Sequence, residues 1–227
     1  MKSINDFFDA IICINLDKRI DRWQECQIQF KKHNLNVKRF SATEGNPMGW
    51  TPYKGCFEGK MHSFNGNMGC IDSHLRIYKL AKNNNWKNVL IIEDDCDFID
   101  DLDKIFEDNI KDVPDNWDLL YFGGIHETRN NKYLPEPISN NLVRAKRIIT
   151  TTCYAIKNTC YDLAIDIITK NKPEFTTAID GYLAAGIQPK CNTYAFHPPL
   201  AWQRSSYSDI QQGNRDYSNM MKNNNIK

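Results

Sequence analysis

The chain has 227 residues, of which 41% are hydrophobic, and its 29 basic side chains nearly balance its 28 acidic ones. This length and composition suit one folded domain with a sizeable core, and a net charge of +1 gives no reason to expect nucleic acid or an anionic membrane as a partner. No apolar run approaches the ~20 residues that a membrane-spanning helix needs.

The N-terminal part of the chain predicts a strand, a helix and a second strand. Residues 10–16, AIICINL, predict a buried strand. The N-terminus does not resemble a signal peptide, because its apolar part is short and Asp6 and Asp9 interrupt it. A helix is predicted over 21–32 and a second strand over 37–40. Such a unit places the turn after its first strand at the ligand-facing edge of a sheet.

The middle of the chain predicts a long loop, a helix and the central strand of the sheet. Residues 46–69 are rich in Gly, Pro, Asn and aromatic residues, which predicts a loop without regular structure. The helix predicted over 71–83 carries His74 near its apolar face, where a packing role is commoner than ligand binding. Residues 89–92, VLII, predict a strand buried on both faces, as in a parallel sheet.

Four acidic residues follow this strand within five positions: Glu93, Asp94 and Asp95, and then Asp97 after Cys96. Clustered carboxylates repel one another and resist burial. Because ligands bind beyond the carboxyl ends of strands in open α/β sheets, the cluster favours a divalent ion held by these acids. The alternative interpretation is that the acids simply begin a solvated loop.

The rest of the chain predicts further helices and strands. Gly123 and Gly124 follow one strand, where a tight turn is the commoner explanation and close approach of the backbone to a ligand is the alternative. A short helix over 177–185 carries Asp180, and an isolated acid in such a segment is commonly a cap or surface residue. The other predicted elements are a helix over 102–110, a strand over 117–122, one or two strands within 142–156, a helix over 158–170 and a last strand over 188–196.

We expect residues 1–204 to form a single domain and residues 205–227 a polar, loosely attached tail, one end of which can fold over the site. The eight cysteines include no CxxC pair, which argues against a zinc ribbon or a small disulfide scaffold. Without an export signal, the cysteines are predicted to be reduced thiols in a cytoplasmic protein.

Several short motifs occur in one order between residues 10 and 210. They are CINLDKR at 13–19 with Arg22, SATEG at 41–45, GCIDSHLR at 69–76, LIIEDDCDF at 90–98, WDLLYFG at 117–123 and the closing segment at 199–210. In this order they resemble glycosyltransferase family 25, which groups bacterial lipooligosaccharide galactosyltransferases with collagen hydroxylysine galactosyltransferases. Thr43 and Glu44 differ from the residues commonest there in the family, and the basic pair usual after SHLR is absent.

The resemblance implies a GT-A-type fold, a nucleotide-binding α/β sandwich with a mostly parallel central sheet. It also implies inverting transfer of a hexose, galactose or glucose, from a UDP-sugar to a hydroxyl of a glycan or a hydroxylated protein. The implied cofactor is Mn²⁺ or Mg²⁺, which neutralises the charge that grows on the UDP diphosphate as it leaves. Oxygen ligands suit these ions better than they suit zinc.

The same resemblance implies roles for individual residues. For the metal it implies Asp95 first, with Asp97 as a second candidate; His197 is a candidate late ligand or, alternatively, a structural residue. Asp180 is implied as the base that takes the proton of the acceptor hydroxyl. The remaining implied contacts are Asn15 and Leu16 with uracil, Arg19 or Arg22 with phosphate or base, Ala42 in the SATEG turn with the donor, Glu93 and Asp94 with the metal ligand or the ribose, and His74 and Gln203 with the donor sugar or acceptor.

Two other functions compete with this prediction. A nucleotidyl- or phosphoryl-transferring enzyme can use similar acids, but the phosphate-loop pattern GxxxxGK[ST] is absent from the sequence. The second is a non-catalytic module that binds glycan or nucleotide on a degenerate transferase fold. The intact acidic triplet and Asp180 argue against such a module.

Overall fold

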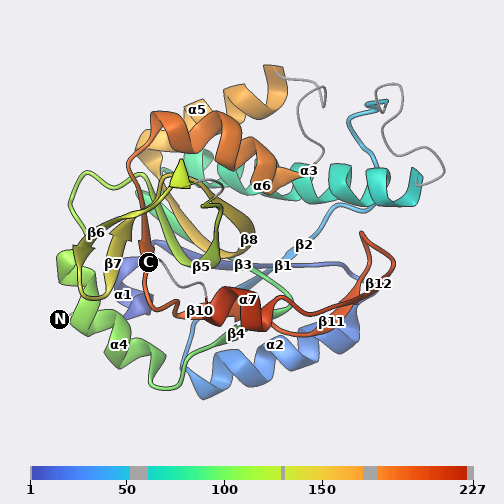
Figure 1. The fold of residues 1–227 in the computed structure, drawn as a ribbon. Helices are drawn as coiled ribbons and strands as arrows, with labels where there is room; N and C mark the ends of the chain where they lie inside the picture. Colours follow the sequence, from blue (N-terminus) through green and yellow to red (C-terminus); the bar gives the residue numbers. More distant parts are fainter. Residues whose placement is uncertain (1, 52–60, 129–130, 171–177, 224–227) are drawn as a thin grey trace.

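The structure, a computed structural model, describes residues 2–51, 61–128, 131–170 and 178–223. Within these residues the chain forms an eight-stranded sheet in the order β2-β1-β3-β8-β5-β9-β7-β6, with helices on both faces (Figure 1). Strands β8 and β7 run against the direction of the others, so the predicted α/β fold with a mostly parallel central sheet is confirmed. The strands are β1 (Ala10–Asn15), β2 (Lys38–Ser41), β3 (Asn88–Glu93), β5 (Leu119–His126), β6 (Glu136–Ser139), β7 (Leu142–Arg144), β8 (Ile148–Lys157) and β9 (Thr193–Phe196).

Apolar side chains alternate between the faces of the central strands and build two cores. Ile12 and Ile91 pack on one face, whereas Ile11 and Leu90 pack on the other. Helices α3 (Met61–Asn83), α5 (Asn158–Lys170) and α6 (Ile179–Tyr182) cover the first face, and α1 (Ile4–Phe7), α2 (Ile20–Lys32) and α4 (Leu102–Asn109) cover the second. No helix of the described residues has the length and hydropathy needed to cross a membrane.

Several elements follow their predicted limits closely because their local patterns are strong. The helix predicted over 158–170 is α5, the one over 21–32 is α2 and the one over 102–110 is α4. The first predicted strand is β1, and its whole length is buried. Two strands, β7 and β8, form within 142–157, one of the two arrangements that the sequence left open.

Helix α3 begins earlier than predicted, at Met61, so the predicted loop over 46–69 is wrong at its C-terminal end. Residues 52–60 of that loop lie outside the described residues. Phe64, Met68 and Ile71 occur at helical spacing and are fully buried against the sheet. Packing of this stripe outweighs the low helix propensity of the intervening glycine and asparagine residues.

Strand β5 continues through Gly123 and Gly124, so the predicted end of the strand and the predicted tight turn are both wrong. A Cβ atom at Gly123 would lie 1.8 Å from the carbonyl oxygen of Ala201. A Cβ atom at Gly124 would lie 2.7 Å from Cγ1 of Ile148. The glycines therefore allow β10 (Ala201–Gln203) and β8 to approach β5 closely. The close approach at these positions is thus to neighbouring strands, whereas the sequence had suggested a ligand as the alternative to a turn.

The segment between α6 and β9 contains less regular structure than predicted. The helix predicted over 177–185 is α6 followed by a π-helical turn, η3 (Leu183–Ile187); residue 177 lies outside the described residues. A 3-10 turn, η4 (Gln188–Lys190), precedes β9, so the last strand is shorter than the predicted 188–196. Gln188 is buried in the core, and its side-chain Nε2 donates to the Tyr121 hydroxyl at 2.9 Å.

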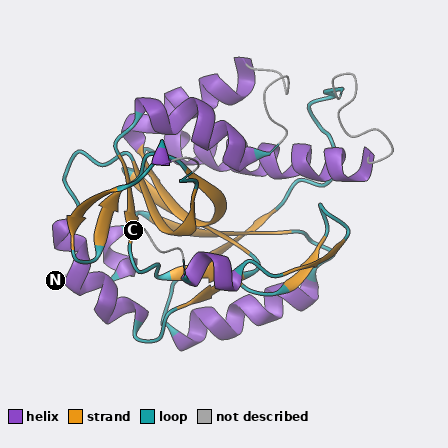
Figure 2. Ribbon diagram, in the orientation of Figure 1, coloured by secondary structure: helices purple, strands orange, loops and turns teal. Residues whose placement is uncertain are grey.

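The C-terminal residues pack against the sheet beside the short strand β4 (Cys96–Phe98), which pairs with β10. Strands β11 (Ser206–Ser208) and β12 (Gly213–Arg215) form an antiparallel hairpin, and α7 (Ser218–Lys222) follows it (Figure 2). Met221 of α7 is fully buried. Residues 205–223 are therefore attached more closely than the polar composition of the predicted tail suggests.

Candidate active site

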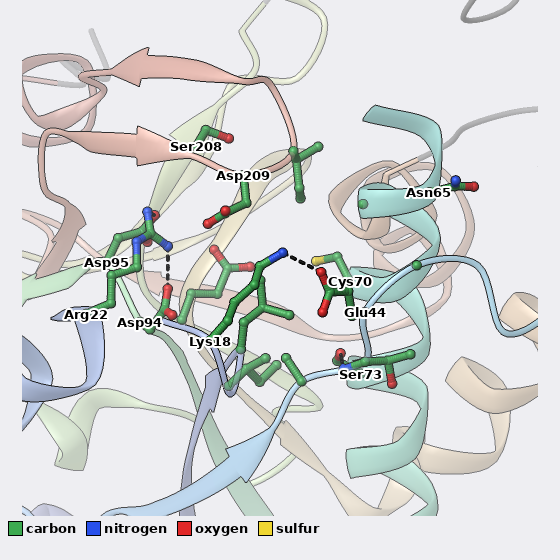
Figure 3. Close-up of a pocket in the computed structure, with 18 of the residues that line it drawn as sticks. Lys18, Arg22, Glu44, Asn65, Cys70, Ser73, Asp94, Asp95, Ser208 and Asp209 are labelled. Atoms are coloured by element: carbon green, nitrogen blue, oxygen red, sulfur yellow. Dashed lines mark hydrogen bonds and ion pairs between the residues drawn. The ribbon is translucent and has the colours of Figure 1, made fainter. Parts of the chain in front are cut away.

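A cavity of about 410 Å³ opens at the carboxyl ends of β1 and β3 (Figure 3). These strands are parallel neighbours, with Ile14 aligned to Glu93, so the residues that follow both strands meet at one edge of the sheet. Helix α3 and the hairpin β11–β12 provide the other walls. The predicted site residues that line the cavity are Leu16, Arg22, Ala42, His74, Glu93, Asp94, Asp95 and Gln203.

Arg22 on α2 links the acidic turn after β3 to the C-terminal hairpin. It is 8% exposed, and its guanidinium donates to the carboxylate of Asp94 and, at 3.2 Å, to Oδ2 of Asp95 (Figure 3). The same group donates to the Ser206 hydroxyl at 2.7 Å and to the Tyr207 carbonyl at 3.1 Å. A single buried arginine therefore balances part of the negative charge of the turn and holds the hairpin near it.

Asp95 keeps one oxygen unpaired in this buried environment. Its Oδ2 accepts from Gln203 Nε2 at 3.0 Å, whereas its buried Oδ1 has no hydrogen-bond partner within the described residues. Burial raises the pKa of Asp95 to about 7; the charge of Arg22 opposes this rise, and the charges of Glu93 and Asp94 add to it. A cation at Oδ1 would lower the pKa of Asp95 again, because its positive charge stabilises the ionised carboxylate.

Asp94 is held more completely than Asp95. Asn15 is 1% exposed, lies outside the cavity lining and donates through Nδ2 to Asp94 Oδ2 at 2.7 Å. Burial raises the pKa of Asp94, and the charge of Arg22 and the Asn15 hydrogen bond oppose this rise. Asn15 therefore orients the acidic turn through its side chain.

The residues of the turn fit a hard divalent ion such as Mn²⁺ or Mg²⁺. Such ions prefer oxygen ligands, and Glu93, Asp94 and Asp95 supply carboxylates along one wall of the cavity. The unpaired Oδ1 of Asp95 is the atom that best meets this requirement, because it is buried without a proton donor among the described residues.

A second group of ligand-type side chains lies where α3 faces β3. One ligand atom each from Cys70, His74 and Glu93 lies within 4.8 Å of the others. His74 Nε2 is 3.6 Å from Glu93 Oε1, and His74 Nδ1 is 2.8 Å from the Tyr154 hydroxyl. Glu93 Oε1 also accepts from the Thr151 hydroxyl at 2.6 Å. His74 thus has hydrogen-bonded packing on one side of its ring and faces an acid on the other.

Arg19 and Asp97 do not line the cavity, although both were predicted site residues. Arg19 forms ion pairs with Asp21 and with Asp209 of the C-terminal hairpin. Asp97 lies on β4, where it pairs with Arg204 at 3.3 Å. Arg204 also donates to the backbone carbonyl of the acidic turn, so this pair supports the turn from outside the cavity.

His197 and Asp180 also lie outside the cavity lining. His197 occupies a separate small pocket together with His126, so the structure does not bring it together with Asp95 as the predicted metal ligand. Asp180 is at the start of α6, where its Oδ2 accepts from the backbone N–H of Thr150 at 3.3 Å. Burial raises the pKa of Asp180.

Some residues that line the cavity were not assigned a role from the sequence. Lys18 and Glu44 form an ion pair near the opening (Figure 3). Most of these residues lie inside the motifs that carry the family resemblance. Their membership of those motifs was therefore the signal by which the sequence could have marked them as site residues. The polar and charged ones among these unassigned lining residues include Lys18, Thr43, Glu44, Asn65, Cys70, Ser73, Ser208 and Asp209, of which Asn65 lies in the predicted loop over 46–69.

Sequence comparison places the motifs in a wider context. A family model described as "Glycosyltransferase family 25 (LPS biosynthesis protein)" matches residues 8–180. The chain is 26% identical over 206 residues to the procollagen lysyl hydroxylase and glycosyltransferase of Acanthamoeba polyphaga mimivirus, which covers 81% of this chain and 22% of that protein. It is 26% identical over 162 residues to human procollagen galactosyltransferase 2, covering 66% of this chain and 26% of the relative. The chain thus spans about a quarter of the length of these curated relatives.

Comparison with solved structures supports the fold. The crystal structure of a glycosyltransferase involved in the glycosylation of the major capsid of PBCV-1 matches with a TM-score of 0.53 and 10% sequence identity. The match covers 89% of this chain and 95% of the other. At this identity the likeness concerns the fold alone, and it agrees with the predicted GT-A-type architecture.

Proposed function

Because the chain belongs to glycosyltransferase family 25, we propose that it transfers a hexose, galactose or glucose, from a UDP-sugar to a hydroxyl of a glycan or a hydroxylated protein. The proposed transfer inverts the configuration at the sugar carbon and requires Mn²⁺ or Mg²⁺. The observation that carries this proposal is the unpaired, buried Oδ1 of Asp95 beside the cavity at the carboxyl ends of β1 and β3. The name of one relative, a procollagen galactosyltransferase, favours galactose.

The charges around the cavity suit a nucleotide diphosphate. Asp95, with Glu93 and Asp94 beside it, would hold the divalent ion, which when bound supplies Lewis-acid stabilisation of the leaving UDP. Lys18 and Arg22 bring positive charge to the same cavity, and Arg22 keeps the acidic turn in place. The backbone of the β1–α2 turn, beginning at Asn15 and Leu16, is the proposed uracil contact.

Asp180 stays the proposed base for the acceptor hydroxyl. Its raised pKa, caused by burial, brings the carboxylate nearer to the range in which a base accepts a proton effectively at neutral pH. The backbone N–H groups of Thr150 and Gly181 oppose the rise and favour the ionised form that a base requires. His74 and Gln203 are proposed to contact the donor sugar or the acceptor.

The test measures UDP release from a panel of UDP-sugars with and without Mn²⁺. We expect metal-dependent release from one UDP-hexose, and a loss of at least about 100-fold in kcat/KM in Asp95→Ala and Asp95→Asn. Asp97→Asn is the matched control, because Asp97 lies two residues along the same acidic segment but outside the cavity lining. We expect that variant to retain activity within about threefold.

The panel also separates the proposed transferase from the competing functions. Metal-dependent binding of a UDP-sugar without any turnover, even with glycan and hydroxylated-peptide acceptors present, would favour the non-catalytic binding module. Failure of every UDP-sugar to bind would overturn the donor assignment. Equal losses in the Asp95 and Asp97 variants would show that the acidic segment acts through its fold, contrary to the proposed metal contact.

A further inference from the structure

We propose that Cys70, His74 and Glu93 form a binding site for a zinc-class divalent cation. The site does not use Asp95, and Glu93 is the one carboxylate that it shares with the group proposed to hold Mn²⁺ or Mg²⁺. The three side chains come from two elements, α3 and β3, that face each other across the cavity wall. Cys70 and His74 are four residues apart on α3, so both project from the same side of that helix. Their ligand atoms and an oxygen of Glu93 lie within 4.8 Å of one another.

The histidine is arranged as a metal ligand would be. His74 is fully buried, and its Nε2 has no hydrogen-bond partner among the described residues, although the Glu93 carboxylate lies 3.6 Å away. The other ring nitrogen, Nδ1, is engaged by the Tyr154 hydroxyl at 2.8 Å. A metal-bound histidine usually has its second nitrogen fixed by such a contact, which orients the ring.

Glu93 is supported in the same manner. Its Oε1 accepts from the Thr151 hydroxyl at 2.6 Å, which fixes the carboxylate against β8. The cation would therefore meet two ligands whose orientations are already held by the neighbouring strands. Of the three ligands, only the Cys70 side chain has no hydrogen bond of this kind within the described residues, and a thiolate rotates readily about its single side-chain torsion.

The set of ligand atoms determines which ion the site prefers. Sulfur, imidazole nitrogen and one carboxylate oxygen form a mixed set of the kind that binds zinc, whereas Mn²⁺ and Mg²⁺ favour oxygen ligands. Binding breaks the S–H bond of Cys70, releases its proton to solvent and forms a thiolate–metal bond, so no oxidant or reductant is needed. Three protein ligands leave a fourth position of a tetrahedral ion open toward the cavity.

One consequence rests on the proposed function. Because His74 and Glu93 line the cavity proposed for the donor, an ion held there would compete with the UDP-sugar for the same space. Zinc is therefore expected to inhibit transfer in the presence of saturating Mn²⁺. A zinc-selective chelator should relieve this inhibition. The ion site itself is tested without any measurement of activity.

The test uses Co²⁺ as a spectroscopic substitute for Zn²⁺ in the metal-free full chain. We expect one bound Co²⁺, a thiolate-to-cobalt charge-transfer band in the near ultraviolet, and loss of that band on addition of Zn²⁺. Cys70→Ser should abolish the band and weaken cobalt binding by more than about tenfold. Cys191→Ser is the matched control, because Cys191 is a partly exposed thiol outside the cavity lining. Asp95→Asn tests whether cobalt binding is independent of Asp95. Both variants should keep the charge-transfer band.

A second measurement needs no variant and so does not depend on the folding of Cys70→Ser. Zinc should slow the alkylation of Cys70 by N-ethylmaleimide at least about tenfold, as followed by mass spectrometry of the peptide that contains it. Absence of the cobalt band in the wild-type chain, its persistence in Cys70→Ser, or unchanged alkylation in zinc would each overturn the site. A band with no UDP-sugar turnover would support the site while the proposed function fails.

Discussion

His126 on β5 is a buried residue that the fold keeps uncharged. It is 6% exposed, and its Nδ1 lacks a hydrogen-bond partner in the described part of the chain. Burial, with a smaller effect from the charge of His197, lowers the pKa of His126 to about 4. In the unfolded chain the pKa returns to about 6.5. Between these values the unfolded state therefore binds more protons than the folded state.

This difference predicts a loss of stability in mild acid. The stability that neutral His126 preserves is fully present above about pH 6.5 and is lost as the pH falls toward about 4. At pH 5 the loss in the free energy of unfolding amounts to about 2 kcal/mol. Urea unfolding of the wild type and of His126→Gln at pH 7 and pH 5 measures this contribution. The variant should lose about 2 kcal/mol less than the wild type over that interval, and equal losses in both proteins would contradict the prediction.

At the scale of elements, two arginines at the start of α2, Arg19 and Arg22, hold the hairpin β11–β12 over the cavity. Arg22 donates to Ser206 and to the Tyr207 carbonyl. Arg19 pairs with Asp209, whose side chain is 26% exposed, and also with Asp21, whose side chain is 64% exposed. The pair with Asp209 closes the hairpin onto the cavity, whereas the pair with Asp21 stays within the start of α2.

The two acidic partners of Arg19 predict different effects on donor binding. Asp209→Asn should raise the donor KM up to about fivefold, because a partly exposed ion pair contributes about 1 kcal/mol at most to holding the hairpin. Asp21→Asn should leave the donor KM within about twofold, since that pair does not reach the hairpin. Steady-state kinetics at low salt measures both variants. An equal rise in the two variants would show that Arg19 acts through its helix and not through the hairpin.

The packing of β10 on β5 predicts a strong requirement for glycine at position 123. Gly123→Ala places a Cβ atom 1.8 Å from the Ala201 carbonyl oxygen, so the strands must separate. We expect a loss of at least about 3 kcal/mol in the free energy of unfolding, measured in urea. Gly213→Ala in β12 is the control, because its nearest neighbour, Arg215 Nη1, is 3.6 Å away and the change should stay within about 0.5 kcal/mol. Similar losses at both positions would contradict the packing argument.

At the scale of the whole molecule, the cavity joins segments that are far apart in the sequence. Its lining comes from the β1–α2 turn, from residues 42–45 after β2, from α3, from the acidic turn after β3 and from the C-terminal segment with Gln203 and the hairpin. A ligand that contacts all of these segments binds the folded state only. Its binding therefore stabilises the whole fold and not one local element.

This arrangement predicts that the donor and the metal together raise the melting temperature. At a UDP-sugar concentration about 100 times its Kd, the stabilisation is about 2.7 kcal/mol, and Tm should rise by about 5 to 10 °C for a chain of this size. Differential scanning calorimetry with and without Mn²⁺ measures the shift. In Asp95→Asn the part of the shift that depends on Mn²⁺ should disappear. A full shift in that variant would argue against Asp95 as the metal contact.

The sequence by itself determined the elements whose signals are local. The apolar runs at 10–15 and 89–92 are buried strands, the period of 158–170 is a helix, and the acids from Glu93 to Asp95 stand at the end of a strand where the cavity lies. Hydrophobic periodicity decides such elements because each residue faces the core or the solvent in a regular repeat. The family motifs likewise marked most of the segments that line the cavity.

Only the tertiary structure decided which of these residues meet. The early start of α3 depends on Phe64 packing against the sheet, and the role of Gly123 depends on the carbonyl of Ala201. The Arg19–Asp209 pair joins residues that are 190 positions apart, and His197 lies in a different pocket from Asp95. Each of these outcomes is a contact between distant segments, which the order of strands in the sheet fixes and which no local pattern of residues encodes.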